Sequence, residues 1–181
     1  MELTVTKREE KLGKLRRDSK IPCIIYGAKE PAEQIAIDRT EYEAILRGLE
    51  EGQILTTKFS LKIGKKTVKA IIKDIQYHRT TYNILHIDFL RLSDDIQVKI
   101  KVPIRFKGAA DCEGVKQGGV LKQPIRAVRV QCFPKDIPNE MYLDVSDIKL
   151  LHNKSLSSVK IPEKVKPLLS LNEVIAVVAK R

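Results

Sequence analysis

One stretch of the sequence alternates apolar and polar residues without a break in its apolar positions, and it restricts the fold more than any other feature. The apolar positions are Ile96, Val98, Ile100, Val102, Ile104 and Phe106, and the polar positions include Gln97, Lys99, Lys101, Arg105 and Lys107. Because successive side chains of a β-strand point to opposite faces, this strand must bury one face in a core. The other face is left for solvent or a partner. The chain therefore has to build a sheet that is covered on one side.

Further strands are expected on either side of this stretch. In the second half, residues 125–133, 141–145 and 173–179 are rich in β-branched residues, and a glycine-rich connection lies at 114–121. Prolines at positions 134, 138, 162 and 167 exclude long helices there. We therefore predict a mostly β C-terminal domain over residues 94–181.

The first half predicts a small β-barrel over residues 1–93. Strands are expected at 21–27, 34–38 and 84–92, together with a hairpin over 55–76 that turns at Gly64. One helix should begin at Asp38, which forms a capping-box pattern with Glu41, and be ended by Gly48 and Gly52. Five or six short strands with one or two helices favour a closed or partly closed barrel, because closure removes unpaired strand edges. The whole chain is thus predicted to be mainly β.

The charge of the chain favours a polyanionic partner, with nucleic acid first. Lys and Arg total 34 and Asp and Glu total 23, which gives a formal net charge of +11. Seven basic residues fall within positions 7–20, in what reads as a glycine-interrupted loop. Such a loop suits phosphate contacts, and the alternative is an ordinary solvated basic loop. The basic strand face of Lys99, Lys101, Arg105 and Lys107 is equally open between a nucleic acid, a neighbouring protein and solvent.

Targeting and redox signals are absent from the sequence. No run approaches the roughly 18 apolar residues of a spanning helix, and residues 1–14 lack the apolar core of a secretory signal, so we expect a cytoplasmic protein with no membrane partner. Cys23, Cys112 and Cys132 are widely spaced, which predicts buried, reduced thiols and neither a zinc site nor a disulfide framework. We expect no cofactor and no metal ion.

The segment 85–89 carries the clearest candidate for chemistry. A strand period of two places His86 and Asp88 together on one face and Leu85, Ile87 and Phe89 on the other. A carboxylate is repelled by phosphates, so on a basic surface it indicates contact with a base edge or a cation. The alternatives are an acid–base pair of a small enzyme and a surface pair with no function.

For two further residues, the strand pattern alone allows a purely structural role. Gln76 should share the face of Val68, Ala70 and Ile72 and be a strand-end amide. Tyr26, at the end of its strand, is either a packed aromatic or a platform on which a base can stack.

Several short motifs, in order along the chain, resemble those of one protein family. They are the basic N-terminal segment with Arg8, IPCIIYG at 21–27, KDIQYH at 73–78, HIDF at 86–89, VPIRFKG at 102–108, GVKQGGVL at 114–121, FPKDIP at 133–138 and LDVSDI at 143–148. The chain resembles the bacterial large-subunit ribosomal protein family L twenty-five, in its long, two-domain form of the Ctc type.

The resemblance implies a non-catalytic protein of the large ribosomal subunit that binds 5S rRNA at the irregular helix called loop E. It implies an N-terminal β-barrel similar to the anticodon-binding domains of glutaminyl-tRNA synthetases, and a monomer away from the ribosome. The residues it implies for RNA contact are Arg8, Lys14, Arg16 and Arg17 at phosphates, and Tyr26, Gln76, His86 and Asp88 in the groove. Neighbouring ribosomal proteins are further candidate partners of the C-terminal domain. The alternative function is a stress-related or tRNA-binding protein that acts away from the ribosome.

Overall fold

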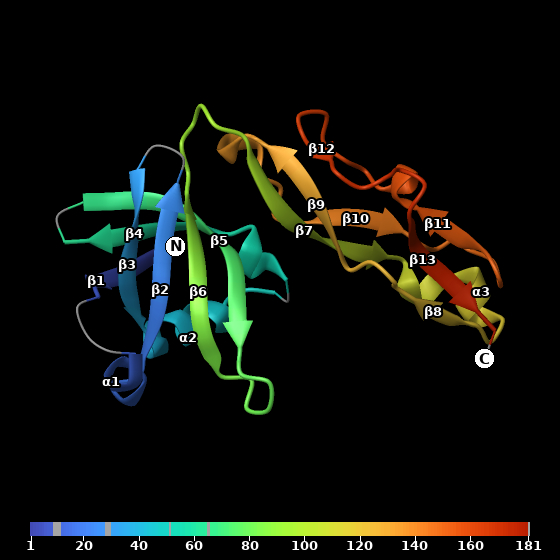
Figure 1. Ribbon diagram of the computed structural model, residues 1–181. Coiled ribbons are helices and arrows are strands. Elements are labelled where there is room, and N and C mark those ends of the chain that lie inside the picture. The colour runs from blue at the N-terminus through green and yellow to red at the C-terminus, as the bar shows by residue number, and fades with distance from the viewer. Residues whose placement is uncertain (9–11, 28–29, 51, 65, 181) are drawn as a thin grey trace. The chain divides into compact units, whose positions relative to one another are not determined.

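A computed structural model describes residues 1–8, 12–27, 30–50, 52–64 and 66–180, without the side chains of Leu12 and Arg16 (Figure 1). The contacts divide the chain into two units, Met1–Ile96 and Gln97–Arg181. Each unit is described by itself below.

The first unit is a closed six-stranded barrel, which confirms the fold predicted for this half. Its elements are β1 (Glu2–Lys7), α1 (Leu12–Arg17), β2 (Lys20–Gly27), β3 (Glu30–Asp38), α2 (Arg39–Arg47), the 3-10 turn η1 (Gln53–Leu55), β4 (Lys58–Ile63), β5 (Lys66–Tyr77) and β6 (Ile84–Arg91). The strand order is β1-β3-β2-β6-β5-β4, and parallel pairing of β1 with β4 closes the barrel. Closure leaves no strand edge open within the barrel.

The barrel core consists mainly of Ile, Leu and Val with two phenylalanines. Phe59 and Phe89 meet edge to face, with ring centroids 6.1 Å apart, a geometry that aromatic pairs favour. Cys23 is fully buried among these residues, and burial raises the pKa of its thiol. Cys112 and Cys132 are also buried, and none of the three is in a disulfide, which confirms the prediction of buried thiols.

The helix predicted from Asp38 is confirmed, but only half of its capping box forms. The Asp38 carboxylate accepts the backbone N–H groups of Thr40 at 2.7 Å and Glu41 at 3.4 Å, and these bonds lower its pKa. The Glu41 carboxylate does not close the box, because it accepts the backbone N–H of Thr4 in β1 at 3.1 Å. Glu41 therefore ties α2 to the first strand of the barrel.

The basic segment contains a helix where a loop was predicted, so this prediction was wrong for residues 12–17. α1 packs against β2, and Leu15 lies in the core with 3% of its surface exposed. A six-residue helix is too short to give periodicity, since a helical pattern needs at least two turns to repeat. β1, before this segment, was likewise not predicted.

A bulge in β5 decides which residues face outward. Ile72 pairs with Phe89, but Asp74 and not Lys73 pairs with Asp88, so Lys73 is an extra residue in β5. From this point the alternation is reset by one residue. Gln76 consequently pairs with His86 and is exposed, so the prediction that it shares the face of Val68, Ala70 and Ile72 was wrong.

The second unit is also built from β-strands, as predicted. Its elements are β7 (Val98–Lys107), η2 (Ala109–Asp111), α3 (Glu113–Lys116), β8 (Val120–Lys122), β9 (Ala127–Cys132), η3 (Pro134–Asp136), β10 (Met141–Asp144), β11 (Asn153–Ser155), η4 (Leu156–Ser158), β12 (Lys166–Pro167) and β13 (Val174–Ala179). They form a four-stranded sheet of order β10-β7-β9-β12 and a three-stranded sheet of order β11-β13-β8.

The alternating stretch forms β7, with one buried face as expected. Val98, Ile100, Val102 and Ile104 are buried in the core of this unit. Ile96 precedes the strand, and Phe106 is only half-buried, so the alternation extends beyond the covered region at both ends. No helix within the described residues is long and apolar enough to cross a membrane.

Candidate nucleic-acid interface

Five polar side chains gather on the outer surface of three neighbouring strands. They are Tyr26 of β2, Asp74 and Gln76 of β5, and His86 and Asp88 of β6, and we call them the recognition face. β6 is the central strand of the three, paired in parallel with β2 and antiparallel with β5. In the register, Gln76 lies opposite His86 and Asp74 lies opposite Asp88. The structure thus brings together the four groove residues that the resemblance implies and adds Asp74.

His86 and Asp88 form a hydrogen-bonded pair at the centre of this face. His86 Nδ1 and Asp88 Oδ1 are 2.7 Å apart, and about a quarter of each side chain is exposed. A carboxylate has no proton to give, so Nδ1–H donates and Asp88 accepts. In the neutral ring, Nε2 is then the acceptor, and the second carboxylate oxygen adds another. The pair therefore offers acceptors held in a fixed geometry.

The two carboxylates also affect Tyr26. Burial, and then the negative charges of Asp88 and Asp74, raise the pKa of the Tyr26 hydroxyl above its ordinary value. The phenol is therefore a neutral O–H donor beside two carboxylates at neutral pH. Together with the amide of Gln76, the face carries both donors and acceptors, which is what contact with base edges requires.

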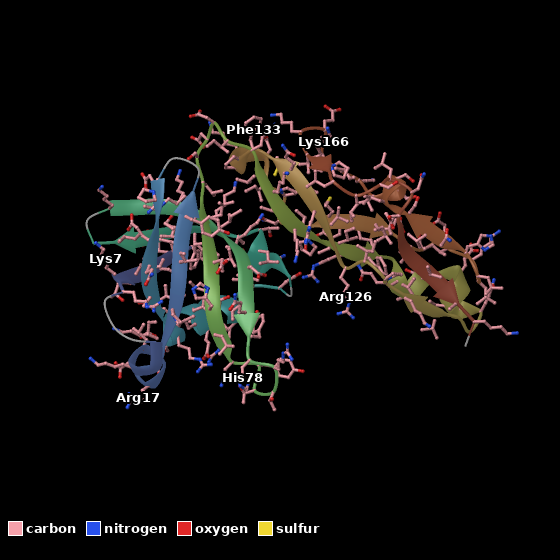
Figure 2. The ribbon with its side chains drawn as sticks, viewed as in Figure 1. Lys7, Arg17, His78, Arg126, Phe133 and Lys166 are labelled. Atoms are coloured by element: carbon pink, nitrogen blue, oxygen red, sulfur yellow. The ribbon has the colours of Figure 1, made fainter. Side chains whose placement is uncertain are left out.

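The basic segment leads directly into β2, one of these three strands, and α1 packs against it. Lys14 and Arg17 are exposed on α1, and the Arg17 Nε–H donates to the Gly13 carbonyl at 3.3 Å (Figure 2). Arg8 is half-buried at the end of β1, where its backbone N–H donates to the Gln34 carbonyl at 3.1 Å. The side chain of Arg16 lies outside the described residues.

The sheet of the second unit has its own basic face. Lys99 and Lys101 of β7 are exposed and lie opposite Gln131 and Arg129 of β9, so Lys101 and Arg129 form a like-charge cross-strand pair. Like charges directly opposite each other on neighbouring strands are destabilising unless an anion lies near them.

The other basic residues predicted on this face have partners within the unit. The Arg105 Nε–H donates to the Glu140 carboxylate at 2.7 Å. The Lys107 ammonium lies 4.0 Å from the centre of the Tyr142 ring, a cation–π contact.

Metal binding finds no support in the described residues. No three or more His, Cys, Asp or Glu side chains gather there in a way that could hold a metal ion. The arrangement of His86 and Asp88 suits hydrogen bonding to a ligand that lies across the sheet.

Comparison with known proteins covers nearly the whole chain. Residues 3–89 match the Ribosomal L25p family, and residues 97–181 match the C-terminal domain of ribosomal protein TL5. The large ribosomal subunit protein bL25 of Chlamydia abortus is 43% identical over 185 aligned positions, which cover 100% of both chains. The proteins of the same name from Chlamydia pneumoniae and Chlamydia trachomatis serovar A are 43% and 40% identical with the same coverage.

Proposed function

Because the chain belongs to the ribosomal L25p family, in the long form with a TL5-type C-terminal domain, we propose that its recognition face binds 5S rRNA at the irregular loop E helix. Membership in this family makes the protein a structural, non-enzymatic component of the large ribosomal subunit. The acid–base reading of His86 and Asp88 is therefore set aside. We assign RNA binding to the N-terminal domain, residues 1–93, and place the protein with the ribosome in the cytoplasm.

The single observation that carries this proposal is the register of β5 and β6. The bulge at Lys73 turns Gln76 to the outer surface and sets it opposite His86. An amide, an imidazole and a carboxylate then lie in one patch whose hydrogen-bonding groups can meet the edges of bases. A surface that merely held phosphates would have no use for Asp88, since two negative charges repel each other.

The shape of the RNA explains why loop E suits this face. In a regular A-form helix the major groove is deep and narrow and hides the base edges from side chains. Non-Watson–Crick pairs widen the groove and expose these edges, so that side chains on the outer surface of the barrel can reach them. The proposal thus explains why the face is polar and fixed in place.

The cations of the basic segment supply the part of the RNA affinity that does not depend on the RNA sequence. Lys14 and Arg17 are exposed on α1, and we assign phosphate contacts to them and to Arg8 and Arg16. Binding should then weaken steeply as salt rises, because counterions released from the RNA are taken up again.

A competition between two RNAs tests the proposal. His86→Ala should weaken binding to a loop E fragment about 10-fold and leave binding to a regular duplex of equal length unchanged, as expected for a lost base contact. His152→Ala is the matched control, because His152 is exposed in the other unit and its ring nitrogen contacts the Leu150 carbonyl. Equal affinity of the unaltered protein for both RNAs would contradict the proposal. Sedimentation with the free fractions instead of large subunits would favour a role away from the ribosome.

A further inference from the structure

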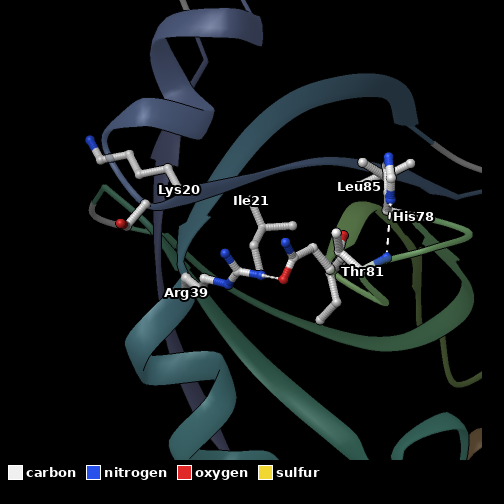
Figure 3. Close-up of a pocket in the computed structure, with 9 residues that line it drawn as sticks. Lys20, Ile21, Arg39, His78, Thr81 and Leu85 are labelled. Carbon is white, nitrogen blue, oxygen red and sulfur yellow. Dashed lines mark hydrogen bonds between the residues drawn. The ribbon is translucent and has the colours of Figure 1, made fainter.

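A pocket of about 350 Å³ opens at one end of the N-terminal barrel (Figure 3). Four separate segments of the chain meet there: residues 19–21 after α1, Arg39 at the start of α2, the loop between β5 and β6, and the first residues of β6. The volume lies at the lower end of the range for small-ligand sites in proteins.

Hydrogen bonds between these segments hold the pocket in shape. The backbone N–H of Arg39 donates to the Ser19 carbonyl at 3.0 Å, and the backbone N–H of His78 donates to the Asn83 carbonyl at 2.7 Å. The Arg39 Nη2 group also donates to Asn83 Oδ1 at 2.7 Å, a bond drawn in Figure 3. The pocket is therefore preformed, and a ligand need not order the chain in order to bind.

The lining combines an apolar wall with polar groups. Ile84 and Leu85, which are half-buried, supply aliphatic surface beside the buried Ile21. The backbone N–H groups of Thr80 and Thr81 approach His78 Nδ1 at 3.4 and 3.2 Å, so Nδ1 is an acceptor and the remaining ring nitrogen, Nε2, carries a hydrogen that can be donated.

Cations also border this lining. Lys20 and Arg39 both line the pocket. The Arg39 guanidinium also forms an ion pair with Glu43, with Nε 3.0 Å from Oε1. A nucleobase matches such a lining, since it has apolar faces, polar edges and a phosphate attached through its sugar.

The pocket lies between the two elements assigned to RNA contact. Ser19 is two residues beyond Arg17 at the end of α1, and Ile84 is two residues before His86, about 7 Å away along β6. A strand of RNA that contacts both α1 and the recognition face therefore passes close to the pocket.

Two residues at the pocket have an unusual backbone conformation. Ser19 and Tyr82 both have φ of +55°, in the left-handed region that non-glycine residues rarely adopt. Such strain persists where the surrounding structure enforces it, and it is found often at binding sites. Tyr82 stands between two residues that line the pocket and is 77% exposed, so its ring is available for stacking on a base.

We propose that this pocket binds one unstacked nucleotide of the RNA held by the recognition face, with its base against Ile84 and Leu85 and its phosphate near Lys20. This inference rests on the proposed RNA-binding function. It adds a second mode of recognition, because a pocket selects a base that has left the helix, whereas the sheet reads bases within it.

Filling the pocket tests the inference. Thr81→Trp places an indole at a residue that lines the pocket, and Thr80→Trp is the matched control, since its neighbour Thr80 does not line the pocket. We expect Thr81→Trp to weaken binding to 5S rRNA about 10-fold relative to Thr80→Trp, as for loss of one stacked base. Equal affinity of the two variants would overturn the pocket and leave the RNA-binding proposal standing.

Cross-linking of the unaltered protein decides the matter even if the tryptophan variants do not fold. Ultraviolet irradiation of its complex with 5S rRNA should attach one nucleotide to the peptide that contains residues 78–85, through a residue between His78 and Leu85 that lines the pocket. Cross-links found only on His86, Asp88 or β2 beyond Ile21 would overturn the pocket alone. If the unaltered protein does not bind 5S rRNA, both this inference and the proposed function fail.

Discussion

The two carboxylates of the recognition face should respond in opposite ways to loss of their charge. Asp74 and Asp88 lie directly opposite each other on β5 and β6, but only Asp88 is hydrogen-bonded to His86, at 2.7 Å. Under the proposed function, Asp88 faces a base edge, whereas Asp74 adds only a negative charge near the RNA. We therefore compare Asp88→Asn with Asp74→Asn, two substitutions that make the same chemical change.

The size of each effect follows from the contacts. Asp88→Asn replaces a carboxylate oxygen with an NH₂ donor, and loss of a good base contact costs about 1–3 kcal/mol, or about 5- to 150-fold in affinity. Asp74→Asn removes a repulsion between exposed charges, which is worth about 1 kcal/mol or less. It should leave the affinity unchanged or strengthen it by up to about fivefold.

Protein stability supplies an internal control for this comparison. Asp74→Asn removes the repulsion between two carboxylates on opposed residues, and in Asp88→Asn the amide oxygen can still accept the His86 Nδ1–H, so neither should lower the melting temperature. A loss of affinity in a variant that melts like the unaltered protein then reports on the interface.

The assay is equilibrium binding of each variant to a loop E fragment and to a regular duplex of equal length, at one salt concentration. Asp88→Asn should reduce the preference for loop E, and Asp74→Asn should preserve it. The reasoning is refuted if the two variants lose equal affinity for loop E, or if Asp88→Asn weakens binding to both RNAs by the same factor.

Three further predictions follow from single contacts. Tyr42 is buried with a hydroxyl that has no hydrogen-bond partner within the described residues, so Tyr42→Phe should raise the free energy of unfolding in urea by about 1 kcal/mol, and a lowered value would contradict this. Asp38→Ala should cost about 1 kcal/mol at pH 7 through loss of the helix cap. Since the N–H bonds from Thr40 and the next residue lower the pKa of Asp38, this stabilisation is present above the pKa of the unfolded chain and lost as pH falls through the folded value. The difference in free energy of unfolding between Asp38→Ala and the unaltered protein should therefore become smaller below about pH 4 in urea titrations. A difference that does not change with pH would exclude the helix cap as its source. The double variant Lys14→Gln, Arg17→Gln should reduce the slope of log Kd against log salt concentration by about 1.5 without changing the preference for loop E, and an unchanged slope would remove α1 from the interface.

The elements that could be predicted from the sequence are those specified by residues only a few positions apart in the chain. Asp38 marks the start of α2 because its carboxylate caps N–H groups two and three residues away. β7 was predicted because its buried residues repeat at every second position over one strand. The outer position of His86 and Asp88 also follows from alternation along β6, because the two residues are two positions apart. The structure adds the hydrogen bond between them.

The features that the sequence did not predict depend on pairing between distant segments. The bulge at Lys73 belongs to the pairing of β5 with β6, just beyond Ile71, where the pairing of β5 with β4 ends, and no residue near it in the sequence marks it. For this reason Gln76 was placed on the wrong face and Asp74 was not considered. α1 was not predicted because its six residues are too few to show a periodic pattern; its Leu15 is buried, and the helix packs on β2, which comes later in the chain.

The most direct test of the account is a cryo-EM map of the large ribosomal subunit that contains this protein. We predict that Gln76, His86 and Asp88 contact the bases of the loop E helix of 5S rRNA, with α1 along the neighbouring phosphates. A map in which these three side chains face solvent, and 5S rRNA contacts another surface of the barrel, would contradict the account.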